Sequence, residues 1–272
     1  MQHVVIGAGP AGVIAAEALR KLDPAAGVMV IGDEPEPPYS RMALPYYLIK
    51  QIEESGTYLR KGADHFDKLG IDLRQDRVDS VDPASHTLKL ASGGTQGYDK
   101  LLIATGSTPV RPPIPGMDLE GVHSCWTLAD GRHIAAAAKP GAKVVLMGAG
   151  FIGCIILEAL ARSGADLTVV EMGDRMVPRM MNDIAGNMIK RWCADKGVTV
   201  HTSTSVQSIE PGGADGRRFA VSLSNGEVLS ADLVVSATGV RPNLSFLEGA
   251  GLQTNSGLLI NEHMQTSNPD IY

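Results

Sequence analysis

The sequence predicts an α/β protein made of two three-layer domains, each built around a parallel sheet. One observation is a pattern that occurs twice, at residues 4–19 and 144–160: a short apolar run, then G-x-G-x-x-G, then a run rich in Ala and Leu. Another is the next apolar run, 28–31 in one copy and 167–170 in the other, which an acidic residue closely follows in both cases. The length of 272 residues also suits two domains of ~100–150 residues each.

The first copy has the order strand, helix, strand. Residues 3–6 are mostly apolar and β-branched, which is typical of a buried parallel strand. A helical pattern follows over 11–22, and a second strand is predicted over 28–31. A βαβ unit with a glycine-rich turn and a terminal acidic residue is the fingerprint of a Rossmann-type dinucleotide site. A tight turn without a ligand is the alternative, and the combination of features favours the ligand.

The residues of this turn each have a physical role in the predicted site. Gly7 permits the tight turn, Gly9 lets a pyrophosphate approach the backbone, and Gly12 lets helix and strand pack closely. The free N–H groups and the dipole at the helix N-terminus then favour an anion. After the second strand, Asp33 or Glu34 can accept hydrogen bonds from a ribose, and both candidates stay open.

The second copy repeats this order, with a strand over 143–147, a helix from about 152 to 162 and a strand over 167–170. Its loop glycines are Gly148, Gly150 and Gly153. Glu171 follows the last strand, where a carboxylate accepts bonds from a 2′-hydroxyl and repels a 2′-phosphate, so NAD(H) is predicted rather than NADP(H). Arg175 could meet a phosphate, but a solvated loop cation is the favoured interpretation. Two such turns predict two dinucleotides, as in an enzyme that passes hydride between a nicotinamide and a flavin.

Composition excludes several other classes of protein. The net charge of −6 argues against a nucleic-acid surface, which needs clustered Lys and Arg. No run approaches the ~18 apolar residues of a membrane span, and a strand that begins within three residues of Met1 leaves no room for a signal peptide. The seven His residues show no metal-ligand spacing, so no metal is predicted. The cysteines are too few for a disulfide framework, which favours a reducing, cytoplasmic location. They are Cys125, Cys154 and Cys193.

Four further segments, together with the two turns, resemble the FAD-dependent pyridine nucleotide–disulfide oxidoreductase superfamily. They are GDEPEPPYSRMALPYYL (32–48), LLIATGSTPVRPPIPG (101–116), LVVSATGVRPN (233–243) and GLLINEHMQTSNPDIY (257–272). The first of these is similar to the branch of ferredoxin and rubredoxin reductases, nitrite-reductase flavin subunits and apoptosis-inducing factor. The resemblance covers nearly the whole chain, with the segments in the expected order.

This resemblance implies an FAD-binding domain formed by residues 1–110 and 243–272, with an NAD(H)-binding domain, 111–242, inserted in it. It implies that Asp33 and Glu34 hold the adenosine ribose, that Arg41 lies near the FAD diphosphate, and that Thr105 lies against the cofactor. The expected cofactor-binding residues are Gly7, Gly9, Pro10, Ala11, Gly12, Asp33, Glu34, Arg41, Val78, Thr105, Gly106, Gly148, Gly150, Phe151, Ile152, Gly153, Glu171 and Gly239.

The chain departs from the family pattern at several places. No cysteine precedes Cys125, so the redox Cys pair of the disulfide reductases is absent. This absence favours a one-electron protein acceptor or oxygen over a disulfide substrate. Tyr46 and Ile155 stand where relatives often have Lys and Glu. The sequence ends at Tyr272, ahead of the A-x-G-D element and the C-terminal domain of relatives, so one FAD contact is expected to be missing.

The function predicted is that of a flavoprotein oxidoreductase, an enzyme that passes hydride from NADH to FAD. Electrons then go to an acceptor protein, either an iron–sulfur carrier or a partner subunit. This transfer needs no general acid or base, so no catalytic side chain is predicted. The resemblance also implies a homodimer for the full-length form. An NADH oxidase or quinone-type reductase is the first alternative, and a non-catalytic NAD-binding or sensing fragment is the second.

Overall fold

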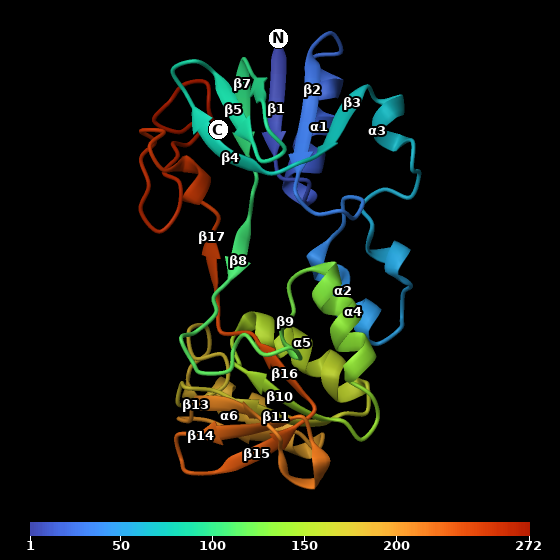
Figure 1. Ribbon diagram of the computed structural model, residues 1–272, viewed down its shortest axis with the longest axis vertical. Coiled ribbons are helices and arrows are strands. Elements are labelled where there is room, and N and C mark those ends of the chain that lie inside the picture. Colours follow the sequence, from blue (N-terminus) through green and yellow to red (C-terminus); the bar gives the residue numbers. More distant parts are fainter. The chain divides into compact units, whose positions relative to one another are not determined.

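The computed structural model describes residues 1–272, which form two compact units. Unit 1 contains Met1–Ser40, Tyr58–Thr108 and Pro242–Tyr272, and unit 2 contains Arg41–Thr57 and Pro109–Arg241. Each unit has its own parallel sheet, with helices on one face and a small antiparallel sheet on the other (Figure 1). The predicted class, two Rossmann-like α/β domains of three layers, is therefore the one observed.

The parallel sheet of unit 1 has the strand order β3-β2-β1-β7. Its strands are β1 (Gln2–Ile6), β2 (Gly27–Gly32), β3 (Ile71–Gln75) and β7 (Lys100–Ile103). Side chains alternate between the two faces, as the strand period requires. On one face Val5 and Val30 pack with Val13 and Ala16 of helix α1 (Pro10–Leu22). The short helix α3 (His65–Lys68) adds Phe66 to this core.

The other face of this sheet is covered by an antiparallel sheet with the order β4-β5-β6. These strands are β4 (Val78–Asp82), β5 (Thr87–Leu90) and β6 (Thr95–Gly97). Leu88 and Leu90 pack there against Val4 and Ile6 of β1. The 3-10 turn η4 (Ser245–Leu247) contributes the buried Leu247 to the same core.

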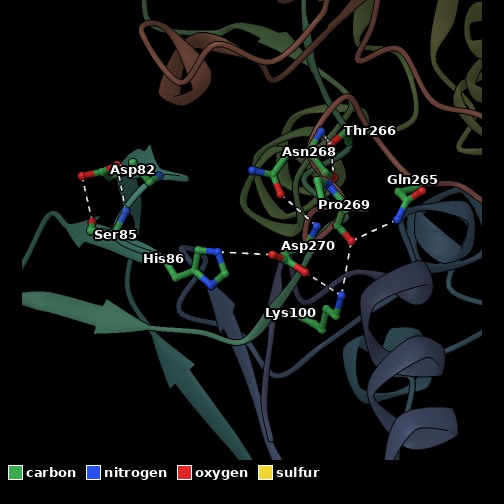
Figure 2. Close-up of polar contacts among 10 residues, drawn as sticks. Asp82, Ser85, His86, Lys100, Gln265, Thr266, Asn268, Pro269 and Asp270 are labelled. Atoms are coloured by element: carbon green, nitrogen blue, oxygen red, sulfur yellow. Dashed lines mark hydrogen bonds and ion pairs between the residues drawn. The ribbon is translucent and has the colours of Figure 1, made fainter.

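The last residues of the chain lie beside β7 and add to the sheet in parallel. The Leu101 N–H donates to the Asp270 carbonyl at 2.9 Å, and the Tyr272 N–H donates to the Leu101 carbonyl at 2.8 Å. The Asp270 carboxylate also accepts from Lys100 at 2.6 Å and lies 3.3 Å from His86. Both contacts are drawn as dashed lines in Figure 2. The Lys100 ammonium lowers the pKa of Asp270. These contacts join a segment far along the chain to the central sheet of unit 1.

The parallel sheet of unit 2 has the order β12-β11-β10-β16-β9. Its strands are β9 (Val122–Ser124), β10 (Lys143–Met147), β11 (Asp166–Val170), β12 (Thr199–His201) and β16 (Leu233–Ser236). The helices on one face are α4 (Leu128–Ala137), α5 (Phe151–Arg162) and α6 (Asp183–Asp195). Helix α4 starts at a capping box of Thr127 and Asp130, and α6 starts where the Asn182 side chain accepts from the Ala185 N–H at 3.0 Å.

The second face of this sheet packs on the antiparallel order β13-β14-β15. These strands are β13 (Val206–Pro211), β14 (Phe219–Leu223) and β15 (Val228–Ala231), with the 3-10 turn η3 (Ala214–Gly216) between the first two. Phe219 and Val221 are buried there against Val145 and Val234 of the parallel sheet. The strands β8 (Ser107–Pro109) and β17 (Val240–Pro242) lie where the chain passes from one unit to the other.

Residues 41–57 belong to unit 2, whereas the sequence places them in the FAD-binding domain. They form η1 (Arg41–Ala43), α2 (Leu44–Leu48) and η2 (Glu54–Thr57). Helix α2 contacts α4 and α5, and the buried Leu48 joins the core of unit 2. Arg132 also donates two hydrogen bonds of 2.7 Å to the Glu54 carboxylate. Packing against residues far along the chain therefore determines which unit this segment belongs to. None of the helices is long and apolar enough to cross a bilayer.

Candidate functional site

The turn after β1 has the geometry that its three glycines predict. Gly7 has φ +111°, and its N–H donates to the Ile31 carbonyl at 2.7 Å. A Cβ on Gly7 would lie 2.3 Å from the Ala104 carbonyl oxygen, and one on Gly12 would lie 1.9 Å from the Gly7 oxygen. Any larger residue at these two positions would collide with backbone. The turn is therefore packed tightly between β1, α1 and the end of β7.

Gly9 differs from its two neighbours because it borders open space. A Cβ placed on Gly9 would have no atom within 4 Å. Gly9 is the N-cap of α1, and no side chain caps the helix there. Pro10 and Ala11 form its first turn, with Pro10 in the position where a missing N–H costs nothing. The room beside Gly9 and the uncapped N–H groups fit a diphosphate, as the sequence predicts.

A cavity of about 460 Å³ opens beside this turn, within unit 1. Four predicted residues line it: Gly7, Asp33, Val78 and Thr105. They come from the ends of β1 and β2, the start of β4 and the end of β7. The crevice at the carboxyl ends of parallel strands, where the strand order changes direction, is the usual ligand site of this architecture. The structure thus brings together residues that lie far apart in the sequence.

Sequence reasoning missed several residues that line this cavity. They include Asp76, Arg77, Thr108, Asn243 and Phe246. Thr108 lies two residues after the first A-T-G element and Asn243 ends the R-P-N element, so the motifs carry a signal for both residues. Arg77 and Phe246 lie in no recognised motif, and only the packing of β4 and η4 places them at the cavity.

The two acidic residues after β2 lie in different surroundings. Asp33 lines the first cavity, whereas Glu34 lines a neighbouring cavity of about 420 Å³. Glu34 also accepts a hydrogen bond of 2.5 Å from the Tyr39 hydroxyl. Asp33 therefore lies at the first cavity, and its role as a ribose ligand stays a prediction. The role of Glu34 at the cofactor stays a prediction.

Arg41 belongs to unit 2, whereas the Gly7–Gly12 turn belongs to unit 1. Its guanidinium lies 5.2 Å from the centre of the Trp126 ring, and its Nη1 donates to the Trp126 carbonyl at 3.2 Å. The predicted contact of Arg41 with the FAD diphosphate stays a prediction. Tyr46, which stands where relatives often have Lys, is 54% exposed on α2.

The turn after β10 repeats the first one closely. Gly148 has φ +94°, and its N–H donates to the Val170 carbonyl at 2.8 Å. Cβ atoms on Gly148 and Gly153 would lie 2.6 Å and 2.2 Å from backbone oxygens. Gly150 is the N-cap of α5, and it borders open space as Gly9 does. The second turn is thus a cradle of the same form as the first.

The predicted cofactor-binding residues beside this turn differ in how far their side chains are exposed. Phe151 is 57% exposed at the start of α5, whereas Ile152 packs on the core of unit 2. Ile155 is half-buried on the same helix. Gly239, at the second A-T-G element, has φ +122°, a conformation that glycine adopts easily. Gly106, in the first A-T-G element of unit 1, has φ +65°.

The Glu171 side chain is hydrogen-bonded to the backbone of the second turn. Its carboxylate accepts hydrogen bonds from the N–H groups of Ala149 at 2.6 Å and Gly173 at 2.7 Å. The residue is only 9% exposed. An ionised carboxylate has about four acceptor positions, so it can still accept bonds from a ribose. The arrangement fixes the carboxylate beside the loop, and its predicted contact with a ribose stays a prediction.

Arg175 lies in the loop after β11, as predicted, and neighbouring groups hold its side chain there. Its Nη1 lies 2.8 Å from both Asp174 Oδ1 and Asp183 Oδ1, and its Nε donates to the Met181 carbonyl at 2.9 Å. The side chain is 23% exposed. Two carboxylates already pair with the guanidinium, which makes it less available to a ribose phosphate.

The three cysteines are packing residues without disulfide partners. Burial raises the pKa of Cys125 to about 12 and that of Cys154 to about 11. Burial also raises the pKa of Cys193. Their thiols are therefore protonated near neutral pH, and a thiolate relay finds no support here.

The family model of the pyridine nucleotide-disulphide oxidoreductases matches residues 1–272. The chain belongs to this family, and the resemblance predicted from its motifs is confirmed. Among curated relatives, it is 31% identical over 272 residues to the NADH-dependent phenylglyoxylate dehydrogenase subunit epsilon of Aromatoleum evansii. That match covers 100% of this chain and 64% of the relative. The chain spans 63% to 66% of the length of several curated relatives.

Two solved structures extend the comparison. The covalent complex of putidaredoxin reductase with putidaredoxin matches with a TM-score of 0.92 and 28% identity, over 99% of this chain and 66% of that one. The water-forming NADH oxidase of Lactobacillus brevis bound to NADH matches with a TM-score of 0.91 and 26% identity, over 100% of this chain and 61% of that one. Both likenesses support the two-domain Rossmann-like fold.

Proposed function

We propose that this chain binds FAD at its first glycine turn and NADH at its second, and that hydride passes from NADH to the flavin. The observation that carries the proposal is the repetition of one cradle in both units. Gly9 and Gly150 border open space at uncapped helix N-termini, and an acidic residue, Asp33 or Glu171, follows the next strand. One dinucleotide would need a single cradle.

The residues of unit 1 fit FAD. Gly9 and the first turn of α1 would hold the diphosphate, and Asp33 would accept bonds from the adenosine ribose. Thr105 would line the wall of the same cavity. Bound FAD supplies the ring that accepts the hydride, while the protein supplies position and electrostatics.

The surroundings of Glu171 support NADH over NADPH. The Ala149 and Gly173 N–H groups donate hydrogen bonds to the carboxylate and fix it in place. A 2′-phosphate next to it would bring two negative groups together. Arg175, the nearest cation in the sequence after β11, is already paired with Asp174 and Asp183. One solved neighbour of this chain, an NADH oxidase, is bound to NADH.

We further infer that electrons leave the flavin to an acceptor protein such as a small iron–sulfur carrier. Support comes from the absence of any cysteine before Cys125, and from the raised thiol pKa of Cys125 and Cys154. A solved neighbour is a reductase joined to putidaredoxin. A homodimer of the full-length form and a cytoplasmic location remain predictions.

An NADH oxidase is the second candidate, because the neighbour bound to NADH has that activity by name. In that case oxygen replaces the acceptor protein, while both cradles keep the same roles. The two candidates therefore differ only in what reoxidises the flavin.

The visible absorption spectrum of the chain, incubated with FAD and desalted, tests the proposal. We expect a flavin band near ~450 nm that bleaches when NADH is added without oxygen. The bleached sample is then divided among oxygen, a ferredoxin, a rubredoxin and a small disulfide. Fast reoxidation by an iron–sulfur protein supports the first candidate, and fast reoxidation by oxygen alone supports the second. Turnover with the disulfide and with no other acceptor would overturn both, and a colourless chain that still binds NADH would indicate a non-catalytic module.

A further inference from the structure

All the polar groups of Asn243, in its backbone and its side chain, form hydrogen bonds with residues at the first A-T-G turn. Its backbone N–H donates to the Gly106 carbonyl at 3.1 Å, and its side-chain Nδ2 donates to the Thr105 carbonyl at 2.9 Å. Its carbonyl accepts from the Thr105 hydroxyl at 3.2 Å, and its Oδ1 accepts from the Thr108 hydroxyl at 2.6 Å. Asn243 lies 138 positions after Thr105 in the sequence.

These bonds form one wall of the first cavity. Thr105, Thr108 and Asn243 all line it, together with Gly7 and Asp33. Gly106 has φ +65°, a conformation that glycine adopts at no steric cost but with the greatest loss of chain entropy. Bonds from another part of the chain can hold such a turn in one conformation before a ligand arrives.

We propose that Asn243 is a positioning residue for FAD, which holds the Thr105–Gly106 turn in the conformation that the cofactor needs. The proposal rests on the proposed function, because it concerns the same cavity. It does not require Asn243 to touch the cofactor. The amide suits this role because it presents a donor to Thr105 and an acceptor to Thr108 at the same time.

The alternatives to Asn at this position each lose part of the network. Asp would keep the acceptor for Thr108 but would place an oxygen against the Thr105 carbonyl in place of the Nδ2 donor. Leu would remove both side-chain bonds and leave the Thr105 carbonyl without this partner. A group left without its partner costs more than the bond itself contributes, so these changes are expected to loosen the turn.

The test measures the FAD dissociation constant by quenching of flavin fluorescence, for the parent chain and four variants, one of which is a control. Asn243→Asp and Asn243→Leu are expected to raise this constant about tenfold or more, and Thr108→Val, which removes one bond, about threefold. The exposed Asn255→Asp, in the same unit, is expected to leave it unchanged. The NADH dissociation constant, which reports on unit 2, is expected to stay the same in all of them.

A spectroscopic readout separates positioning from general loss of structure. The visible circular dichroism of bound FAD is measured at saturating FAD, where every variant carries the cofactor, and a changed band is expected in Asn243→Asp. If Asn243→Asp does not fold, Thr108→Val still tests the network. FAD binding and visible dichroism equal to those of the parent in the folded variants would overturn the positioning role alone. A parent chain that binds no FAD would overturn the proposed function, and the positioning role with it.

Discussion

The carboxylate of Glu171 accepts a hydrogen bond from the Ala149 N–H at 2.6 Å, and this bond joins the end of β11 to the glycine turn after β10. A second bond, from Gly173 at 2.7 Å, holds the other carboxylate oxygen. A nearly buried carboxylate needs such partners, because a polar group that loses water without gaining hydrogen bonds costs free energy. The same side chain thus stabilises the turn and presents a negative group to a ribose.

The first prediction concerns Glu171→Gln. The amide NH₂ would face a backbone N–H in place of an acceptor, so we expect the free energy of unfolding to fall by about 1–3 kcal/mol. We also expect the NADH dissociation constant to rise about tenfold, with a smaller change for NADPH, because the repulsion of the 2′-phosphate is lost. Titration with both nucleotides and urea unfolding measure these effects.

Glu158→Gln is the matched control for this prediction. Glu158 lies on α5 of the same unit, is 63% exposed and lies 3.6 Å from Arg162. Its replacement should change stability by no more than about 0.5 kcal/mol and leave nucleotide binding unchanged. An unaltered NADH affinity in a folded Glu171→Gln variant would contradict the ribose role.

A second prediction compares two glycines of the first turn. In Gly12→Ala the new methyl would lie 1.9 Å from the Gly7 oxygen, so we expect a loss of about 3 kcal/mol or more of stability. In Gly9→Ala the methyl enters open space at an ordinary φ of −77°, so the cost should stay near the ~1 kcal/mol that Ala brings at an N-cap. Thermal unfolding of the cofactor-free chain measures both.

The FAD affinity of Gly9→Ala separates a ligand cradle from a structural turn. We expect the FAD dissociation constant of this stable variant to rise about tenfold, because the methyl occupies the space that the diphosphate needs. The equivalent Gly150→Ala should weaken NADH binding and leave FAD binding unchanged. FAD binding of normal strength in Gly9→Ala would show that the open space is not part of the cofactor site.

A third prediction concerns the thiols. Since burial raises the pKa of Cys125 to about 12 and that of Cys154 to about 11, both are protonated at pH 8. Iodoacetamide should therefore label them on the order of a hundred-fold more slowly in the native protein than in denaturant. Mass spectrometry of timed samples gives the two rates. Fast labelling of native Cys154 would show that its thiol is reactive, and a thiol could then take part in electron transfer.

A fourth prediction concerns acid stability. The hydrogen bond from Arg60 lowers the pKa of Glu17 from its ordinary value of 4.5, and His65 Nε2 lies 2.7 Å from the same carboxylate. The folded pKa lies below the unfolded one, so Glu17 stabilises the fold fully above about pH 4.5. This contribution is lost as the pH falls through the folded value.

Urea unfolding between about pH 3 and 6 tests this contribution. The Glu17→Gln variant should be less stable than the parent near neutral pH and should lose less stability on acidification. Asp72→Asn, an exposed change in the same unit, serves as the control. Parallel pH profiles for the parent chain and Glu17→Gln would rule out the predicted role of the pair.

The sequence by itself determined the strands, helices and glycine turns whose formation depends on local chemistry. The strands at 3–6 and 143–147 follow from β-branched apolar runs. The two turns follow from glycines at positions where a Cβ would collide with backbone oxygens. The helices begin at Pro10 and Phe151, one residue before their predicted starts. These features depend on residues that are neighbours along the chain, so the pattern alone predicts them.

Only the tertiary structure decided which distant residues meet. It separated Asp33 from Glu34 by placing them at different cavities, and it joined Asn243 to Thr105 across 138 positions. It also packed residues 41–57 into unit 2 and paired Arg175 with Asp183. Each of these results depends on the shape of a packed core or on a bond between remote segments. A local sequence pattern does not predict such contacts, because they depend on how the whole chain closes its loops and packs its side chains.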